Sequence, residues 1–185
     1  MKKLKFLWII LFLVLLTVLG YVLNNARNYD LTLKEAENIN QKCNLGLEYM
    51  SFSRLSEERA KQYTIDDPEM AITDDDEVTG YYFNYPENSA DRRLTQIYIK
   101  GSSYDFYGIQ VGDDISKVKT IMAELGYKQK KNIYYPNTAT ERYVKYHICI
   151  EFKTDEKSTE IICISVTPSY PSLTGVIDNL LGKVY

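Results

Sequence analysis

"YGIQVGDDISKVKTIMAELGY", residues 107–127, is the stretch whose pattern decides how the second half of this chain folds. Apolar residues recur along it at the spacing of a helix that packs one face on a core, at Ile115, Val118, Met122 and Leu125. Asp114 precedes the first of them, and its carboxylate suits the N-cap, where it accepts from unpaired N–H groups. The stretch therefore predicts a packed helix that starts after Asp114.

Glycines flank this helix, so a phosphate-binding loop is the alternative interpretation. Such a loop needs the form G-x-x-x-x-G-K-[ST]. Here Gly108 and Gly112 are followed by Asp113 and Asp114, whose charge repels phosphate and complements the positive end of the helix. We therefore assign Gly108 and Gly112 to a strand-to-helix turn, and Gly126 to the end of the helix in a left-handed conformation.

Strand signals dominate the rest of the chain beyond residue 80. Alternating apolar residues predict one hairpin from residues 81–85 and 94–100, with Tyr81, Phe83 and Tyr85 facing Ile97 and Ile99. A second hairpin is expected from residues 142–152 and 160–166, with Tyr146, Ile148, Ile150 and Phe152 on its apolar face. A short strand at 133–135 and a short helix near 176–181 complete the expectation.

An earlier helix is expected to open with a capping box at Thr32–Glu35 and to end near Gly46. Helices and hairpins in this order predict an α+β fold, a two-layer antiparallel sheet with helices packed on one face. The order also allows two degenerate helix-plus-hairpin units. The expected domains are an anchor at 1–23, a polar linker at 24–30 and a domain at 31–185, with lobes 31–105 and 106–185.

The amino-terminal segment "FLWIILFLVLLTVLGYVL", residues 6–23, contains no charge. As a helix rising ~1.5 Å per residue it spans ~27 Å, close to the roughly 30 Å of a bilayer core. Lys2, Lys3 and Lys5 precede it and favour a cytoplasmic amino terminus with the remainder exported. We expect a single-pass anchor in the cell membrane. A cleaved signal peptide is the alternative, but its apolar core is usually about 7–15 residues and an A-x-A site is missing.

Charge disfavours one class of partner. The chain has 22 basic and 25 acidic residues, and without the three anchor-flanking lysines 19 basic residues remain against 25 acidic ones. An acidic exported domain repels phosphate backbones, so we expect no nucleic-acid partner.

Residues 107–167 resemble the G-[IV]-x-x-G-[DMS]-[ST]-x-x-x-V-x-x-x-[LF]-G opening of exported bacterial α/β modules of the β-lactamase-inhibitor-like type. The matching residues are Gly108, Ile109, Gly112, Asp114, Val118 and Gly126. The chain departs from that pattern by having Asp114 where Ser or Thr is commoner, and by a longer helix before the glycine. Such modules mostly bind proteins or cell-wall components without catalytic residues. The resemblance therefore implies an exported binding module and transfers no functional residue.

The chain has three cysteines. In an antiparallel hairpin, the numbers of the two residues in each pair add up to a constant that defines the register. Matching the apolar faces of the second hairpin requires this sum to be even. A sum of 312 places Cys149 opposite Cys163 and permits a disulfide between them, whereas 314 places Glu151 opposite Cys163 and leaves the cysteines diagonal. Cys43 is expected as a small buried apolar side chain. Without C-x-x-C spacing and with one histidine, the chain is expected to hold no metal or cofactor.

Two further features could carry chemistry. His147 would have to serve any Ser-His-Asp or Cys-His set, but no nucleophile motif accompanies it, so a structural role is expected. Residues 66–77 hold seven carboxylates. They lack the spacing of a calcium loop, and a solvated loop is the expectation.

The sequence therefore predicts a membrane-anchored, extracytoplasmic, non-catalytic binding module with a protein or cell-wall partner. We expect an exposed tyrosine patch for this function. One alternative is an extracytoplasmic hydrolase that acts on cell-wall or carbohydrate substrates through carboxylates, which would need a cleft with a desolvated acid. Another is a sensory or immunity-type membrane protein.

Overall fold

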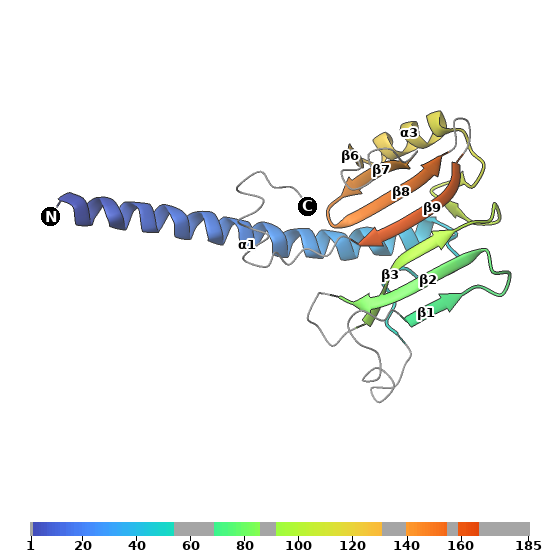
Figure 1. Cartoon of the computed structure of the whole chain (residues 1–185), viewed down its shortest axis with the longest axis horizontal. Helices are drawn as coiled ribbons and strands as arrows, with labels where there is room; N and C mark the ends of the chain where they lie inside the picture. The colour runs from blue at the N-terminus through green and yellow to red at the C-terminus, as the bar shows by residue number, and fades with distance from the viewer. Residues whose placement is uncertain (1, 54–68, 86–91, 131–139, 155–158, 167–185) are drawn as a thin grey trace.

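The computed structural model describes residues 2–53, 69–85, 92–130, 140–154 and 159–166. The predicted elements at 133–135 and 176–181 lie outside these residues. Figure 1 shows one long helix that extends away from a sheet and then passes along it. The α+β architecture predicted from the sequence is confirmed.

Helix α1 (Lys2–Lys42) contains both the apolar segment and the first helix of the domain. It is long and apolar enough to cross a membrane, by its length and composition. Its apolar residues from Trp8 to Leu19 are exposed, whereas Ala36 and Ile39 are buried in the core of the domain. One unbroken helix therefore joins the apolar segment to the domain.

The predicted linker at 24–30 and the helix start at Thr32 are wrong, because these residues continue α1. Adding a residue to an existing helix is far easier than nucleating a new one, and neither Gly nor Pro interrupts residues 24–42. The capping-box side chains have other partners. The Thr32 hydroxyl donates to the Asn28 carbonyl at 2.8 Å, and Glu35 binds residues of the sheet region.

The domain consists of a layer of strands and a layer of helices that share one core. The strands are β1 (Glu69–Ile72), β2 (Val78–Asn84), β3 (Arg92–Ile99), β4 (Asp105–Phe106), β5 (Ile109–Gln110), β6 (Lys128–Lys130), β7 (Thr140–Lys145), β8 (Ile148–Thr154) and β9 (Thr159–Val166). Within the described residues, seven strands form an antiparallel sheet in the order β1-β2-β3-β9-β8-β7-β6. Because β9 pairs with both β3 and β8, this sheet is continuous across the two predicted lobes, whose division stays a prediction.

Helix α3 (Ile115–Glu124) shares one core with α1, since Val118 and Met122 cluster with Ala36 and Ile39. Its start is the predicted one: Asp114 is the N-cap, and its carboxylate accepts from the Ser116 N–H at 2.7 Å. The periodicity of the sequence therefore gave the packed face of this helix correctly.

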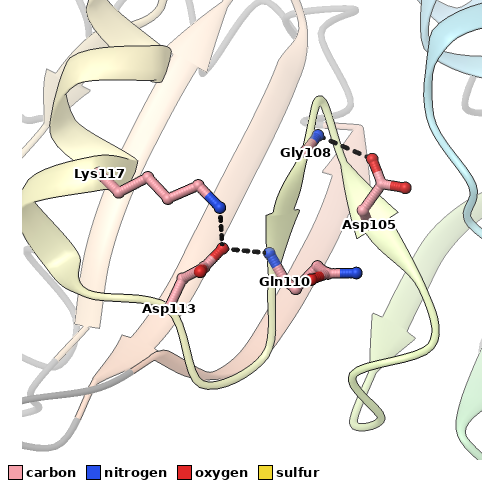
Figure 2. A network of polar contacts seen from close by, with 5 residues as sticks. All are labelled: Asp105, Gly108, Gln110, Asp113 and Lys117. Atoms are coloured by element: carbon pink, nitrogen blue, oxygen red, sulfur yellow. Dashed lines mark hydrogen bonds and ion pairs between the residues drawn. The ribbon is translucent and has the colours of Figure 1, made fainter.

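The turn before α3 is held by carboxylates (Figure 2). Asp113 accepts from the Gln110 N–H at 2.7 Å and pairs with Lys117 at 2.7 Å, and Asp105 accepts from the Gly108 N–H at 2.7 Å. Gly108, Gly112 and Gly126 have φ values of 77°, 96° and 77°. At such positive φ a Cβ is strained, so the glycines fit the predicted turn and helix end.

Two strand details differ from the expectation. In the β2–β3 hairpin, Val78 and Gly80 lie opposite Ile99 and Ile97, and Tyr81 pairs with Gln96 on the other face. The predicted pairing of Tyr81, Phe83 and Tyr85 with the isoleucines is wrong because β2 begins earlier than expected and carries an irregularity between Tyr81 and Tyr82.

The predicted single strand at 142–152 is instead two strands, β7 and β8, joined by the two-residue turn Tyr146–His147. Tyr146 is therefore exposed in a turn and not on the apolar face. Ile148, Ile150 and Phe152 are buried as expected. The turn lacks Gly, Asn or Asp, so the sequence carried no turn signal there.

Candidate binding groove

A groove of about 840 Å³ runs beside α1 at the start of the sheet. One wall is the helix, another is the segment that follows it, and β2 and β3 contribute one side chain each. The lining residues are Leu33, Ala36, Glu37, Asn40, Gly46, Leu47, Glu48, Tyr49, Met50, Ser51, Phe52, Tyr82 and Arg93. This volume lies within the range of roughly 300–1,000 Å³ typical of ligand sites.

Asn40 fixes the position of the segment relative to the helix. Its amide Nδ2 donates to the Tyr49 carbonyl at 2.8 Å, and its Oδ1 accepts from the Tyr49 N–H at 2.9 Å. This two-bond pairing satisfies both backbone groups of Tyr49, whose side chain is buried. The groove wall is therefore tied to α1 by a side chain that acts as a strand partner would.

Residues 50–53 pair with the start of β3 through one isolated bridge, between Phe52 and Arg93. Met50 N–H donates to the Leu94 carbonyl at 2.8 Å, Leu94 N–H to Ser51 at 2.9 Å, and Ser53 N–H to Arg92 at 2.9 Å. Met50 has a φ of 62°, unusual for a residue with a side chain. These bonds hold the strained backbone in place and fix the direction of the residue that follows Ser51.

That residue, Phe52, is 55% exposed. The guanidinium of Arg93 lies 3.9 Å from the centre of its ring, and Arg93 Nη1 donates to the Met50 carbonyl at 3.2 Å. Arg93 Nε is buried without a hydrogen-bond partner in the part of the chain that the structure describes. The groove therefore presents an exposed aromatic ring with a guanidinium group beside it.

Two carboxylates, Glu37 and Glu48, also line the groove, and both residues are exposed. The hydrolase alternative requires an acid whose carboxyl is kept protonated by burial, as in glycosidases. Neither glutamate has that burial. The groove thus combines two exposed carboxylates with one arginine that lies over an aromatic ring.

The predicted structural residues lie elsewhere. Gly108, Gly112, Asp114 and Gly126 surround α3, and none of them lines the groove. The hydrogen bond from Ser116 lowers the pKa of Asp114 below its usual range. Their roles are those of a turn, a helix cap and a helix end.

The Cys149–Cys163 disulfide, which one of the two open registers permitted, is not formed. The β8–β9 register pairs Cys149 with Ser165 and Glu151 with Cys163, which is the sum of 314 and leaves the cysteines diagonal. Cys43, Cys149 and Cys163 are free thiols. Burial raises the pKa of Cys163 to about 12, and Arg142 Nε donates to Cys149 Sγ at 2.9 Å.

His147 is buried at the β7–β8 turn, where its backbone N–H donates to the Thr32 hydroxyl at 3.1 Å. Burial lowers the pKa of its imidazole, which favours the neutral ring. The histidine therefore belongs to the contact between the turn and α1, as the structural interpretation expected.

The acidic run divides between described and undescribed residues. Among residues 69–77, Asp75 accepts from Thr73 at 2.5 Å and from the Tyr104 hydroxyl at 2.7 Å. The described residues contain no group of three or more His, Cys, Asp or Glu side chains that could hold a metal ion.

The expected tyrosine patch is also absent from the described residues outside α1, where Tyr146 is the one tyrosine among the exposed large apolar side chains. The other exposed large apolar side chains in that part of the chain are Phe52, Met70 and Ile72. Most described tyrosines instead pack within the domain, as in the Tyr81–Tyr98 contact with 5.7 Å between ring centres.

No family model, curated protein or solved structure matches this chain. The resemblance to β-lactamase-inhibitor-like modules therefore stays an expectation. The groove has to be interpreted from its own residues. Sequence reasoning missed Phe52 and Arg93, because residues 47–80 show no periodicity and these two residues meet through long-range pairing. It missed Asn40 because the partner of its side chain is the backbone of Tyr49 in that same stretch.

Proposed function

We propose that this chain is a membrane-anchored, extracytoplasmic, non-catalytic binding module of a bacterial cell envelope. The observation that carries the proposal is that α1, which holds the apolar segment, is also one wall of the groove. A binding site built on the anchor helix is held at a fixed height above the membrane. The lysines before the apolar segment support an exported domain.

The groove favours a protein segment as its partner. Aromatic residues and arginine are enriched where protein interfaces are most buried, and such residues often dominate the binding energy. Phe52 offers an exposed ring, and the guanidinium of Arg93 beside it supplies positive charge. A segment with one apolar side chain and one carbonyl or carboxylate acceptor next to it would use both.

Site-specific photo-crosslinking in the full-length chain tests this assignment. A benzophenone analogue of phenylalanine replaces Phe52 in one variant and Met70, on strand β1, in the control. The two side chains are matched in exposure, at 55% and 56%. We expect a discrete protein adduct from position 52 that is absent from position 70. The same adducts from both positions, or none from either, would refute the groove as the binding site.

A second variant separates binding from folding. Arg93→Lys keeps the charge but loses the planar group that stacks on Phe52 and donates to Met50. We expect the adduct from position 52 to weaken in that background while the far-ultraviolet circular dichroism stays unchanged. An undiminished adduct would show that Arg93 takes no part in recognition.

One observation favours the sensory alternative as a second candidate. An unbroken helix from the apolar segment to the core can transmit a rotation or shift, whereas a flexible linker cannot. Inserting two glycines between Asn24 and Asn25 interrupts the helix and keeps the tether. Both a binding module and a sensor should still give the position-52 adduct after this insertion. A sensor should in addition lose its cellular response.

A further inference from the structure

We infer that the domain rests on the lipid headgroup layer of the membrane that its own anchor crosses, with the β7–β8 turn, Lys145–His147, at the contact. The inference rests on the membrane anchoring in the proposed function. It adds a second interaction surface, distinct from the groove, whose partner is the bilayer surface.

The first argument is the length of α1 between the apolar segment and the domain. Leu23 ends the apolar run, and Tyr29 already stacks on Tyr85, which follows β2, with 5.6 Å between ring centres. Six helical residues at ~1.5 Å each place that contact only ~9 Å beyond the apolar run. The headgroup layer itself extends about 5–8 Å from the hydrocarbon core. The domain therefore begins where the headgroups end.

The second argument is the position of the β7–β8 turn. Thr32 on α1 accepts from the N–H of His147, and Glu35 pairs with Lys145 at 2.9 Å. Nine residues separate Leu23 from Thr32, ~14 Å along an untilted helix, which is ~6 Å beyond the outer edge of the headgroup layer. The contact therefore requires α1 to tilt towards the side of the domain that carries this turn. Figure 1 shows this turn at the end of the sheet that faces the amino-terminal part of α1.

The third argument is the residue at the tip of the turn. Tyr146 has a φ of 55°, a conformation in which a two-residue turn favours glycine. Its side chain is 38% exposed, and the ammonium of Lys145 in the same turn lies 5.8 Å from the centre of its ring. Tyrosine is enriched at membrane interfaces, because its ring is apolar and its hydroxyl is polar. A bilayer surface uses both parts of this side chain.

The opposite end of the sheet supplies a control. Strand β3 runs in the same direction as β8, because each is antiparallel to β9, so β3 ends far from the turn. Ser102 follows the end of β3 and is exposed. A probe at Ser102 should therefore lie well above the headgroups while one at Tyr146 touches them.

Tryptophan quenching in vesicles tests the inference. The full-length chain has one tryptophan, Trp8. With Trp8→Phe as background, Tyr146→Trp and Ser102→Trp are each reconstituted in phosphatidylcholine vesicles that carry a spin label at the headgroup. We expect severalfold stronger quenching for Tyr146→Trp than for Ser102→Trp. Equal quenching at both positions would overturn the inference.

The unaltered chain distinguishes this failure from a failure of the anchor. In vesicles with the spin label deep in the acyl chains, Trp8 should be strongly quenched if α1 is inserted. Quenched Trp8 with equal quenching at Tyr146→Trp and Ser102→Trp leaves the anchor intact and refutes the surface contact. Unquenched Trp8 refutes the anchor itself. Should Tyr146→Trp misfold, a spin label on Tyr146→Cys reports the same depth through its accessibility to oxygen.

Discussion

The ammonium of Lys145, at the end of β7, lies 2.9 Å from the Glu35 carboxylate on α1. Glu35 is 6% exposed, and the Tyr127 hydroxyl donates to the same oxygen at 3.2 Å. The buried carboxylate of Glu35 on α1 is thus bound by Lys145 of β7 and by Tyr127, which lies between α3 and β6. This contact joins α1 to β7 and to the segment after α3.

Breaking this contact should destabilise the domain. Glu35→Ala leaves a largely buried ammonium and a buried hydroxyl without their acceptor, so we expect the free energy of unfolding to fall by about 3 kcal/mol. Glu35→Leu combined with Lys145→Met removes both charges and should recover most of that loss. Urea unfolding of the full chain in detergent, followed by circular dichroism, measures both. If Glu35→Ala were as stable as the wild type, the Glu35–Lys145 pair would contribute little to the free energy of unfolding.

The positive φ of Tyr146 leads to a prediction of the opposite sign, a gain in stability. Replacing Tyr146 by glycine removes a side chain from a positive φ, so Tyr146→Gly should stabilise the domain by about 1 kcal/mol. Ser102→Gly, in an exposed loop without a positive φ, serves as the control and should not gain stability. A loss of stability in Tyr146→Gly would show that the tyrosine is needed for packing, contrary to a role at the membrane surface.

The sequence alone predicted some of these elements and missed others. The apolar segment, α3 with its Asp114 cap, and the glycine positions were predictable, because their signals are local and each repeats a known helix or turn pattern. The Tyr146–His147 turn was not, because no turn-forming residue marks it and Thr32, more than a hundred residues earlier, binds its N–H. A bond of that separation leaves no trace in local periodicity.

The groove could not be predicted from the sequence either. Asn40 reads as one polar residue on a helix, yet it pairs with the backbone of Tyr49. Phe52 and Arg93 meet only because residues 50–53 pair with β3. The cysteine pairing was narrowed to two registers, and only the strand register of the structure decided between them.

Acid should weaken the domain through His147. Burial lowers the pKa of its imidazole below the ordinary 6.5, so the unfolded chain takes up the proton first as the pH falls. Stability from the neutral ring is complete above pH 6.5 and decreases as the pH falls towards the folded pKa. His147→Gln should flatten that part of the curve of unfolding midpoint against pH. An unchanged slope would assign the effect to other groups.

The thiols should be slow to react. Burial raises the pKa of Cys43 and Cys163 to about 12, and it also raises that of Cys149. Because the thiolate is the reactive form, we expect labelling of the folded chain by a disulfide reagent at least about tenfold slower than in urea. The intact mass in air should show no loss of two hydrogen atoms. Rapid formation of a Cys149–Cys163 disulfide would contradict the register of β8 and β9.

The central claim is that α1 crosses the cell membrane and holds the domain outside, and accessibility of Ser102→Cys in intact cells tests it most directly. Ser102 is exposed, whereas the native thiols are buried or half-buried, so the wild-type chain gives a low background. A membrane-impermeant maleimide should label Ser102→Cys in intact cells as fully as in lysed cells. Labelling that appears only after lysis would place the domain in the cytoplasm and contradict the account.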